Sequence, residues 1–149
     1  MADEILAKAL GALGRKARTE AEMREWLQAR EVDFEEEERV ISFLKENLAL
    51  GDRAFAIAFV NDRRQLAGWG RDRIRSVLLR RGVSRDLIDE ALAGDGEESE
   101  VDRAVRVLVE KGANLEDDRG RQRALGLLAR RGYEAEEAYA AIRIAGRAA

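Results

Sequence analysis

The chain of 149 residues is 46% apolar, enough to bury a modest core in one ordinary domain or in a short row of small modules. It has no cysteine and no histidine, which excludes disulfides, thiol nucleophiles and thiolate metal sites, and removes the commonest metal ligand and neutral-pH acid–base group. The formal charge of -3 excludes a uniformly cationic protein that coats nucleic acid indiscriminately.

The dominant residue types are good helix formers. Alanine, leucine, glutamate and arginine prevail and proline is absent, so we predict an all-α fold. No apolar run approaches the roughly 20 residues that span a bilayer, and no basic stretch precedes the short apolar positions at the N-terminus. We therefore expect a soluble, unprocessed protein of the cytoplasm, without a membrane contact.

Three helices are predicted in the first third of the chain. Apolar residues at i, i+3 and i+4 spacing indicate an amphipathic helix over residues 3–13. Thr19 with Glu22 forms a capping-box pattern that begins a second helix, and Asp33 begins a third. The acids at 35–38 lie in its first turn, where negative charge favours the helix dipole, so a solvated helix start explains them without a function.

The middle third fits three more helices. The inward residues of the first are predicted to be Phe55, Ala58 and Phe59. A Gly-Trp-Gly turn at 68–70 separates it from a helix over 71–81, which Gly82 ends. After a further helix, the glycines and acids at 94–96 are expected to form a linker or flexible joint.

The last third repeats this pattern of three helices. Its predicted inward residues are Val101, Val105, Leu108 and Val109 on the first helix, Leu125, Leu127 and Leu128 on the second, and Ala138, Tyr139 and Ile142 on the third. Gly132 ends the second of these helices.

An internal repeat of about 50 residues relates the three parts. Residues 78–83 match 128–133 at an offset of 50, and 27–32 hold the same place one repeat earlier. Phe55, Ala58 and Phe59 are predicted to map onto Val105, Leu108 and Val109. We therefore predict an elongated array of three tandem three-helix repeats, about nine helices in all, at 1–51, 52–96 and 97–149.

The turn after each second helix is expected to need a left-handed residue. Gly82 and Gly132 meet that need without a Cβ, whereas Glu31 holds the place in the first repeat. We therefore expect the first turn to differ.

Catalysis finds little support in the side chains. No histidine is present to activate the few hydroxyls, and Thr19 and Ser84 already serve as caps. Paired acids such as Asp117 and Asp118 can bind Mg²⁺, but neighbouring acids in a loop are far more often solvated. We expect no enzyme activity, no cofactor and no metal.

Binding is the stronger prospect, because arginine makes up 23 of the 27 basic residues and favours planar, bidentate contact with carboxylate or phosphate. Two positive ridges lie about one repeat apart and can engage a polyanion or an acidic protein groove. The predicted partner-binding residues are Arg71, Arg73, Arg75, Arg80, Arg81, Arg121, Arg123, Arg130 and Arg131. Two alternatives remain: a compositional bias toward arginine, and stems that merely cover the core.

Trp69 lies between two glycines at the entrance of a helix. It either anchors the turn against the preceding helix or stays exposed as a partner contact. No exposed aromatic residues alternate with basic ones, so stacking on single-stranded bases has little support.

The central motifs together resemble the RecX family, regulatory proteins of the bacterial recombinase RecA. The resemblance is carried by LGDRAFA at 50–56, Phe59-Val60, Arg63, GWG at 68–70, Arg73-Ile74, Leu78 and Gly82-Val83. It is densest in the middle third and extends over essentially the whole chain.

The resemblance implies a non-catalytic negative regulator in DNA repair, homologous recombination and the SOS response. Such a protein lies in the groove of the RecA filament on single-stranded DNA. It limits filament growth or stability, ATP hydrolysis, strand exchange and coprotease activity. We expect a monomer.

The acidic first repeat and the net charge lead us to expect that contacts with RecA dominate over weak direct DNA contact. The alternative is a stand-alone nucleic-acid-binding helical repeat protein, whose affinity would fall steeply with salt.

Overall fold

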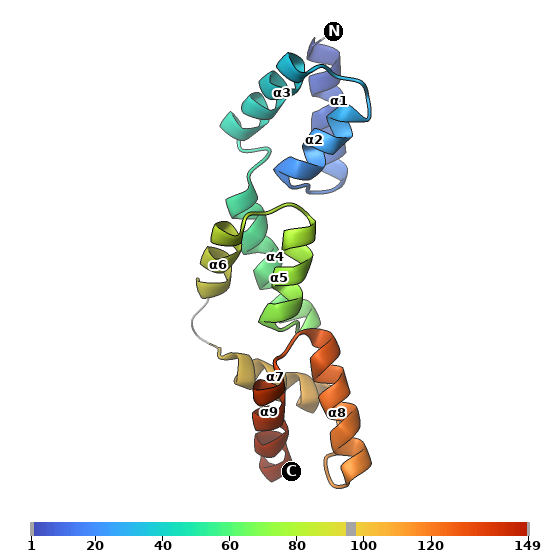
Figure 1. Ribbon diagram of the computed structural model, residues 1–149, viewed down its shortest axis with the longest axis vertical. Coiled ribbons are helices and arrows are strands. Elements are labelled where there is room, and N and C mark those ends of the chain that lie inside the picture. The colour runs from blue at the N-terminus through green and yellow to red at the C-terminus, as the bar shows by residue number, and fades with distance from the viewer. Residues whose placement is uncertain (1, 95–97, 149) are drawn as a thin grey trace.

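The computed structural model describes residues 2–94 and 98–148, and within these ranges the chain forms nine helices and no strand. The helices are α1 (Ala2–Arg15), α2 (Glu20–Gln28), α3 (Phe34–Glu46), α4 (Asp52–Ala67), α5 (Arg71–Arg80), α6 (Arg85–Ala93), α7 (Glu100–Glu110), α8 (Asp118–Arg131) and α9 (Ala135–Ala148). They follow one another as three groups of three along a rod with the chain ends at opposite ends (Figure 1). The predicted all-α class and elongated helical array are confirmed.

Residues 95 and 96 of the expected linker at 94–96 lie outside the described residues. The proposed limits at 51/52 and 96/97 stay predictions.

Side-chain caps begin five of the described helices, and the sequence predicted three of them, Thr19, Asp33 and Ser84. Thr19 accepts a hydrogen bond from the Glu22 amide and Glu22 accepts one from the Thr19 amide, which completes the predicted capping box. Asp33, Ser84, Ser99 and Asp117 cap α3, α6, α7 and α8 in the same way, one side-chain bond each. Each such cap is worth about 1 kcal/mol to a short helix.

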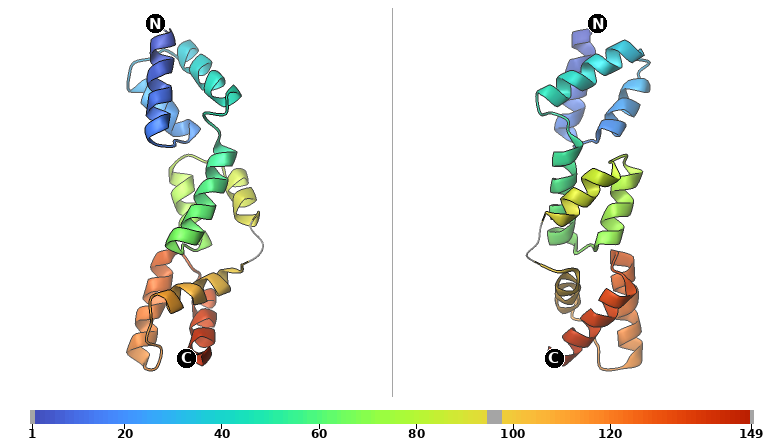
Figure 2. Two further views of the ribbon diagram at one scale, coloured as in Figure 1. Left: turned by 180° about the vertical axis from the view of Figure 1, so that it is seen from behind. Right: turned by 60° about the vertical axis from the view of Figure 1, so that its left-hand side comes forward.

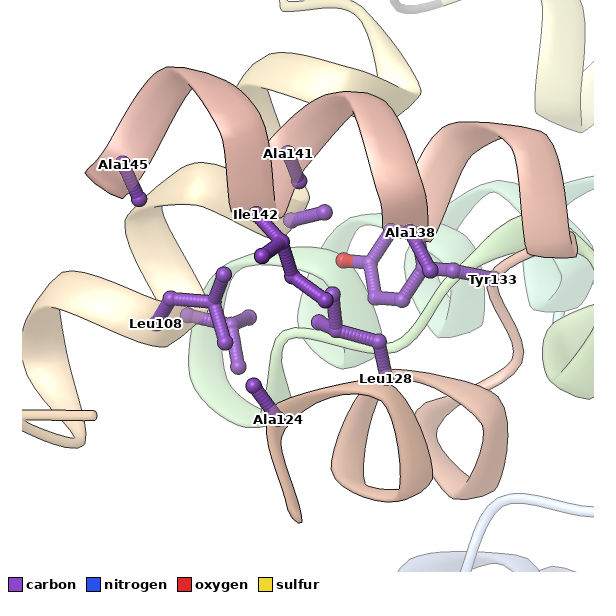
Figure 3. Close-up of a cluster of buried hydrophobic side chains, with 10 residues drawn as sticks. Leu108, Ala124, Leu128, Tyr133, Ala138, Ala141, Ile142 and Ala145 are labelled. Carbon is purple, nitrogen blue, oxygen red and sulfur yellow. The ribbon is translucent and has the colours of Figure 1, made fainter. Parts of the chain in front are cut away.

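The core is divided into three clusters, one for each group of three helices. Met23, Leu27 and Leu44 lie in the first cluster, and Ile74, Leu78 and Ile88 lie in the second. Figure 3 shows the third, where Leu108, Leu128 and Ile142 meet from α7, α8 and α9. Leu27, Leu78 and Leu128 are all completely buried, which agrees with the repeat offsets of 51 and 50.

The predicted correspondence between α4 and α7, the first helices of repeats 2 and 3, is wrong by two residues. The buried residues of α4 are Ala56, Phe59, Val60 and Arg64, and those of α7 are Arg103, Ala104, Val107 and Leu108, which gives an offset of 48. Ala58 is exposed and Val109 is 66% exposed. Phe55 was predicted to point inward, but its ring is only half-buried at the edge of the core. The Arg81 guanidinium lies over this ring, 4.7 Å from its centre.

The turn after α2 does not differ from its equivalents, contrary to expectation. Glu31, Gly82 and Gly132 are all left-handed, with φ of 61°, 90° and 101°. The amide of the next residue bonds to the carbonyl of Leu27, Leu78 or Leu128 in each case, at 3.4, 3.0 and 3.0 Å. The glycines answer a second need, because a Cβ on Gly82 would stand 2.4 Å from the Ala21 Cβ of the preceding repeat. Glu31 is exposed, in the turn between α2 and α3.

The second helices of the three repeats, α2, α5 and α8, stack end to end as one column (Figure 2). The Thr19 hydroxyl at the start of α2 donates to the Arg81 carbonyl at the end of α5, at 2.6 Å. The Gly70 amide at the start of α5 donates to the Arg131 carbonyl at the end of α8, at 2.7 Å. The C-termini of α5 and α8 thus meet the N-termini of α2 and α5, where the opposite ends of the helix dipoles attract.

Candidate functional site

The nine predicted partner-binding arginines all belong to α5 and α8 or to the residue that follows α5, so they lie along the lower two thirds of this column (Figure 1). The structure divides them into three groups by what their side chains contact: the neighbouring repeat, an acid of the same repeat, or solvent.

Four of the nine join one repeat to the next. Arg71 pairs with Glu134 and Glu137 of repeat 3, at 3.3 and 3.1 Å. Arg81 forms two hydrogen bonds to the Glu22 carboxylate of repeat 1, at 2.9 and 3.0 Å. Arg73 donates to the Arg130 carbonyl at 3.2 Å, and Arg131 donates to the Ala67 carbonyl at 2.6 Å. These side chains therefore have structural partners between repeats.

Two more are engaged within their own repeat. Arg75 lies 3.4 Å from Asp89 and 3.9 Å from Asp72. Arg121 pairs with Asp118 and donates to the Leu115 carbonyl at 3.0 Å.

Arg80, Arg123 and Arg130 are the remaining three, and they are exposed. Their side chains form no ion pair or hydrogen bond with any residue in the described ranges. Arg80 and Arg130 hold the same place in consecutive repeats, two residues after the buried Leu78 and Leu128. The charge of these two guanidinium groups is therefore available to a partner at one-repeat spacing.

Charge is distributed unevenly among the repeats. Residues 1–51 hold 12 acidic and 8 basic side chains, whereas 52–96 hold 9 basic and 7 acidic. The middle of the rod is thus its electrostatically positive part, and the N-terminal end is negative.

A buried ionic cluster lies between repeats 2 and 3, and the sequence analysis missed it. Arg103 is 1% exposed and pairs with Glu100 at 2.5 Å, while Arg64 lies 3.7 Å from the same carboxylate. Arg106 lies 3.1 Å from Glu98 and donates to the Arg64 carbonyl at 3.3 Å. The i, i+3 spacing of Glu100 and Arg103 at a helix start was the one sequence signal, and it did not reveal the partner from α4.

Trp69 anchors its turn, as one of the two predicted alternatives states. It is half-buried, with its ring edge-on to Phe59 at 6.1 Å and the Arg73 guanidinium 4.0 Å from its centre. The flanking glycines are required by the next repeat, since a Cβ on Gly68 would stand 2.6 Å from Val107 and one on Gly70 would stand 2.5 Å from the Gly132 carbonyl oxygen. GWG is thus a junction motif.

Two further features bear on function. No helix in residues 2–94 and 98–148 is both long and apolar enough to cross a membrane. Over the same ranges, no three acidic side chains gather in a way that can hold a metal ion.

Comparison with known protein families gives matches to the first two repeats. Residues 6–44 match the family described as RecX, first three-helix domain, and residues 52–92 match RecX, second three-helix domain. Together the matches cover more than half of the chain. The chain belongs to the RecX family.

Curated relatives in the RecX family extend the match into the third repeat. The regulatory protein RecX of Deinococcus radiodurans is 38% identical over 142 residues, which covers 95% of this chain and 68% of the relative. That of Amycolatopsis mediterranei is 30% identical over 132 residues, 86% of this chain and 75% of the relative. The chain spans about half the length of the Clostridium botulinum relative, which is 37% identical over 106 residues.

Two RecX crystal structures share the fold of this chain. RecX from Lactobacillus salivarius superposes with a TM-score of 0.82 over 98% of this chain and 97% of that one, at 15% identity. A second regulatory protein RecX gives 0.73 over 96% and 73%, at 22% identity. Both superpositions extend over all three repeats of this chain. The curated relatives are named regulatory proteins.

Proposed function

We propose that this protein is a non-catalytic negative regulator of RecA. It binds in the groove of the RecA filament on single-stranded DNA and limits filament growth or stability, and with it ATP hydrolysis, strand exchange and coprotease activity. It acts in the cytoplasm as a monomer.

The observation that carries the proposal, beside the family membership, is the placement of Arg80 and Arg130. They are exposed, have no ion-pair partner among the described residues, and recur at equivalent places in two joined repeats. A filament also repeats, so a rod with regularly spaced guanidinium groups can contact successive subunits at once. Binding at two linked positions raises overall affinity without a tight single contact.

The charge distribution supports contact with protein over contact with DNA. Repeat 1 has a surplus of acidic residues, which opposes close approach to phosphate, and the whole chain carries -3. Acidic side chains of RecA are the better partners for the exposed arginines, and direct DNA contact is weak.

The test is a titration of the protein into RecA filaments on single-stranded DNA, with ATP hydrolysis and filament length as readouts and naked DNA as a parallel target. We expect hydrolysis to fall and filaments to shorten at protein concentrations that leave naked DNA largely unbound. Unchanged filaments together with tight, salt-sensitive binding to naked DNA would favour the second candidate, a stand-alone nucleic-acid-binding protein.

A further inference from the structure

A hollow of about 260 Å³ lies between α8 and α9 in repeat 3, on the opposite flank of α8 from Arg123 and Arg130. It is lined by Arg121, Gln122, Leu125, Tyr139, Ile142 and Arg143, and we call it the Leu125–Tyr139 groove. Its floor is apolar and its rim carries two arginines.

The same place is closed by an ion pair in the other two repeats. In repeat 1, Arg24 of α2 contacts Glu38 of α3 at 2.5 Å. In repeat 2, Arg75 of α5 contacts Asp89 of α6 at 3.4 Å. The offsets of 51 and 50 residues that relate the buried leucines carry both members of these pairs onto Leu125 and Tyr139.

Repeat 3 therefore has two apolar side chains where its neighbours have opposite charges. Tyr139 is 51% exposed, and Leu125 is half-buried at the edge of the core. The exchange is not needed to fill the core, because repeats 1 and 2 form their cores with the charged pair. Surface exposure of an apolar pair in a hollow is typical of a contact for another molecule.

The charges around the groove indicate what it binds. No acidic residue lines it. Arg143 is exposed and forms no ion pair with a described residue, and it occupies the place of Ser42 and Ala93 in the other repeats. Arg121 has one acidic neighbour, the highly exposed Asp118. An apolar side chain flanked by carboxylates complements such a surface in both shape and charge.

We propose that the Leu125–Tyr139 groove docks an acidic protein segment by inserting an apolar side chain between Leu125 and Tyr139, with carboxylates on Arg121 and Arg143. The inference rests on the proposed function, in which RecA supplies that segment. It adds an anchor on repeat 3 that is separate from the exposed arginines of the helix column. An apolar anchor in a pocket contributes more to affinity than an exposed ion pair.

The double variant Leu125→Arg, Tyr139→Asp is designed to close the groove. It places in repeat 3 the pair that repeat 2 uses, Arg75 and Asp89, so the helix packing has a precedent within the chain. The matched control is Val109→Arg, which changes an exposed apolar side chain of the same repeat outside the groove. Circular dichroism and thermal melting test whether both variants fold.

The assay titrates wild type, the closed-groove variant and the control into RecA filaments and follows ATP hydrolysis. We expect the closed-groove variant to need about tenfold more protein for half-inhibition and the control to match wild type. An active wild type with an equally active closed-groove variant overturns the groove while leaving the proposed function standing. A wild type without effect on filaments overturns both.

Two additional measurements keep the inference testable. If the double variant unfolds, Arg143→Glu replaces it, since Arg143 is exposed and structurally unpaired, and an unchanged titration again overturns the groove. Fluorescein-labelled single-stranded DNA is the second probe. A loss of DNA binding without a loss of filament inhibition would identify a nucleic-acid groove and overturn the protein assignment.

Discussion

Gly132 packs directly on Arg73: a Cβ on Gly132 would stand 2.4 Å from the Cβ of Arg73 and 2.5 Å from its amide nitrogen. The first residue lies in the turn after α8 and the second in the first turn of α5. The backbone of repeat 3 thus touches that of repeat 2, and the Asp72 amide donates to the Gly132 carbonyl at 3.1 Å in the same place.

Gly132→Ala is expected to weaken the junction between repeats 2 and 3. The new methyl group meets backbone, and φ of 101° is unfavourable for alanine, so we expect a loss of about 2–4 kcal/mol in unfolding free energy. The measurement is urea denaturation. Gly112→Ala is the matched control, because it shares the positive φ of 61° but has no atom within 4 Å of its Cβ, and it should lose only about 1 kcal/mol.

Glu31→Gly should stabilise the protein by about 1 kcal/mol, since glycine removes the cost of a left-handed backbone at this exposed position. Urea denaturation of Glu31→Ala separates this effect from loss of charge. Alanine keeps the strained backbone, so an equal gain in both variants would argue against the backbone explanation.

The sequence predicted the second helices of the repeats well, because Leu27, Leu78 and Leu128 and the turns after them share one register. It failed for the first helices, where Phe55 lies at the core edge and the buried Arg103 takes its place in α7. A register read from apolar residues cannot anticipate a buried arginine whose partner, Glu100, also lies 3.7 Å from Arg64 of the preceding repeat. The exposed Arg80 and Arg130 were within reach of sequence, but the junction contacts of Arg71, Arg73, Arg81 and Arg131 depend on tertiary packing.

Arg80→Glu with Arg130→Glu should reduce filament inhibition and leave stability almost unchanged, because neither side chain has an ion-pair partner in the described structure. Arg81→Glu should instead destabilise, since it faces the Glu22 carboxylate and loses its contact with Phe55. The measurements are half-inhibition of RecA ATP hydrolysis and urea midpoint for each variant. A large fall in the midpoint of the double variant would mean that Arg80 and Arg130 are structural, contrary to the binding proposal.

Acid should loosen the junction between repeats 1 and 2. Burial raises the pKa of Glu22, but the hydrogen bonds from Arg81 and from the Thr19 amide outweigh it and leave the pKa below its ordinary value of 4.5. A carboxyl with a lowered folded-state pKa stabilises fully above its unfolded pKa and loses that contribution as pH falls through the folded value. Stability should therefore fall below about pH 4.5.

Glu22→Gln is the variant that checks this pH dependence. Glutamine retains the capping box with Thr19 and removes the titrating charge. Its urea midpoint should be lower than that of wild type at pH 7 and converge with it in acid. A constant difference between the two proteins across the pH range would assign the acid sensitivity to other carboxyls.

The two junctions should differ in stiffness. Between repeats 1 and 2, the hydrogen bonds from Thr19, from Arg81 to Glu22 and from Glu20 to Asp52 all involve a side chain. Between repeats 2 and 3, two backbone–backbone bonds, the buried ionic cluster and the Tyr133 hydroxyl bond to the Gly68 carbonyl at 2.8 Å act together. Side-chain hydrogen bonds at a surface open more readily than backbone bonds beside a buried cluster. We therefore expect the orientation of repeat 1 to vary, while repeats 2 and 3 form a rigid pair.

The absence of native cysteine makes this difference measurable with spin labels. Two pairs of labels at exposed positions have Ser76→Cys in common. Ser42→Cys with Ser76→Cys spans the first junction, and Ser76→Cys with Ala129→Cys spans the second. Double electron–electron resonance should give a broad distance distribution for the first pair and a narrow one for the second. Arg81→Leu, which removes the ion pair to Glu22, should broaden only the first distribution. Equal widths in the wild-type protein would contradict the expected difference in stiffness and show that the buried cluster adds no rigidity beyond that of the first junction.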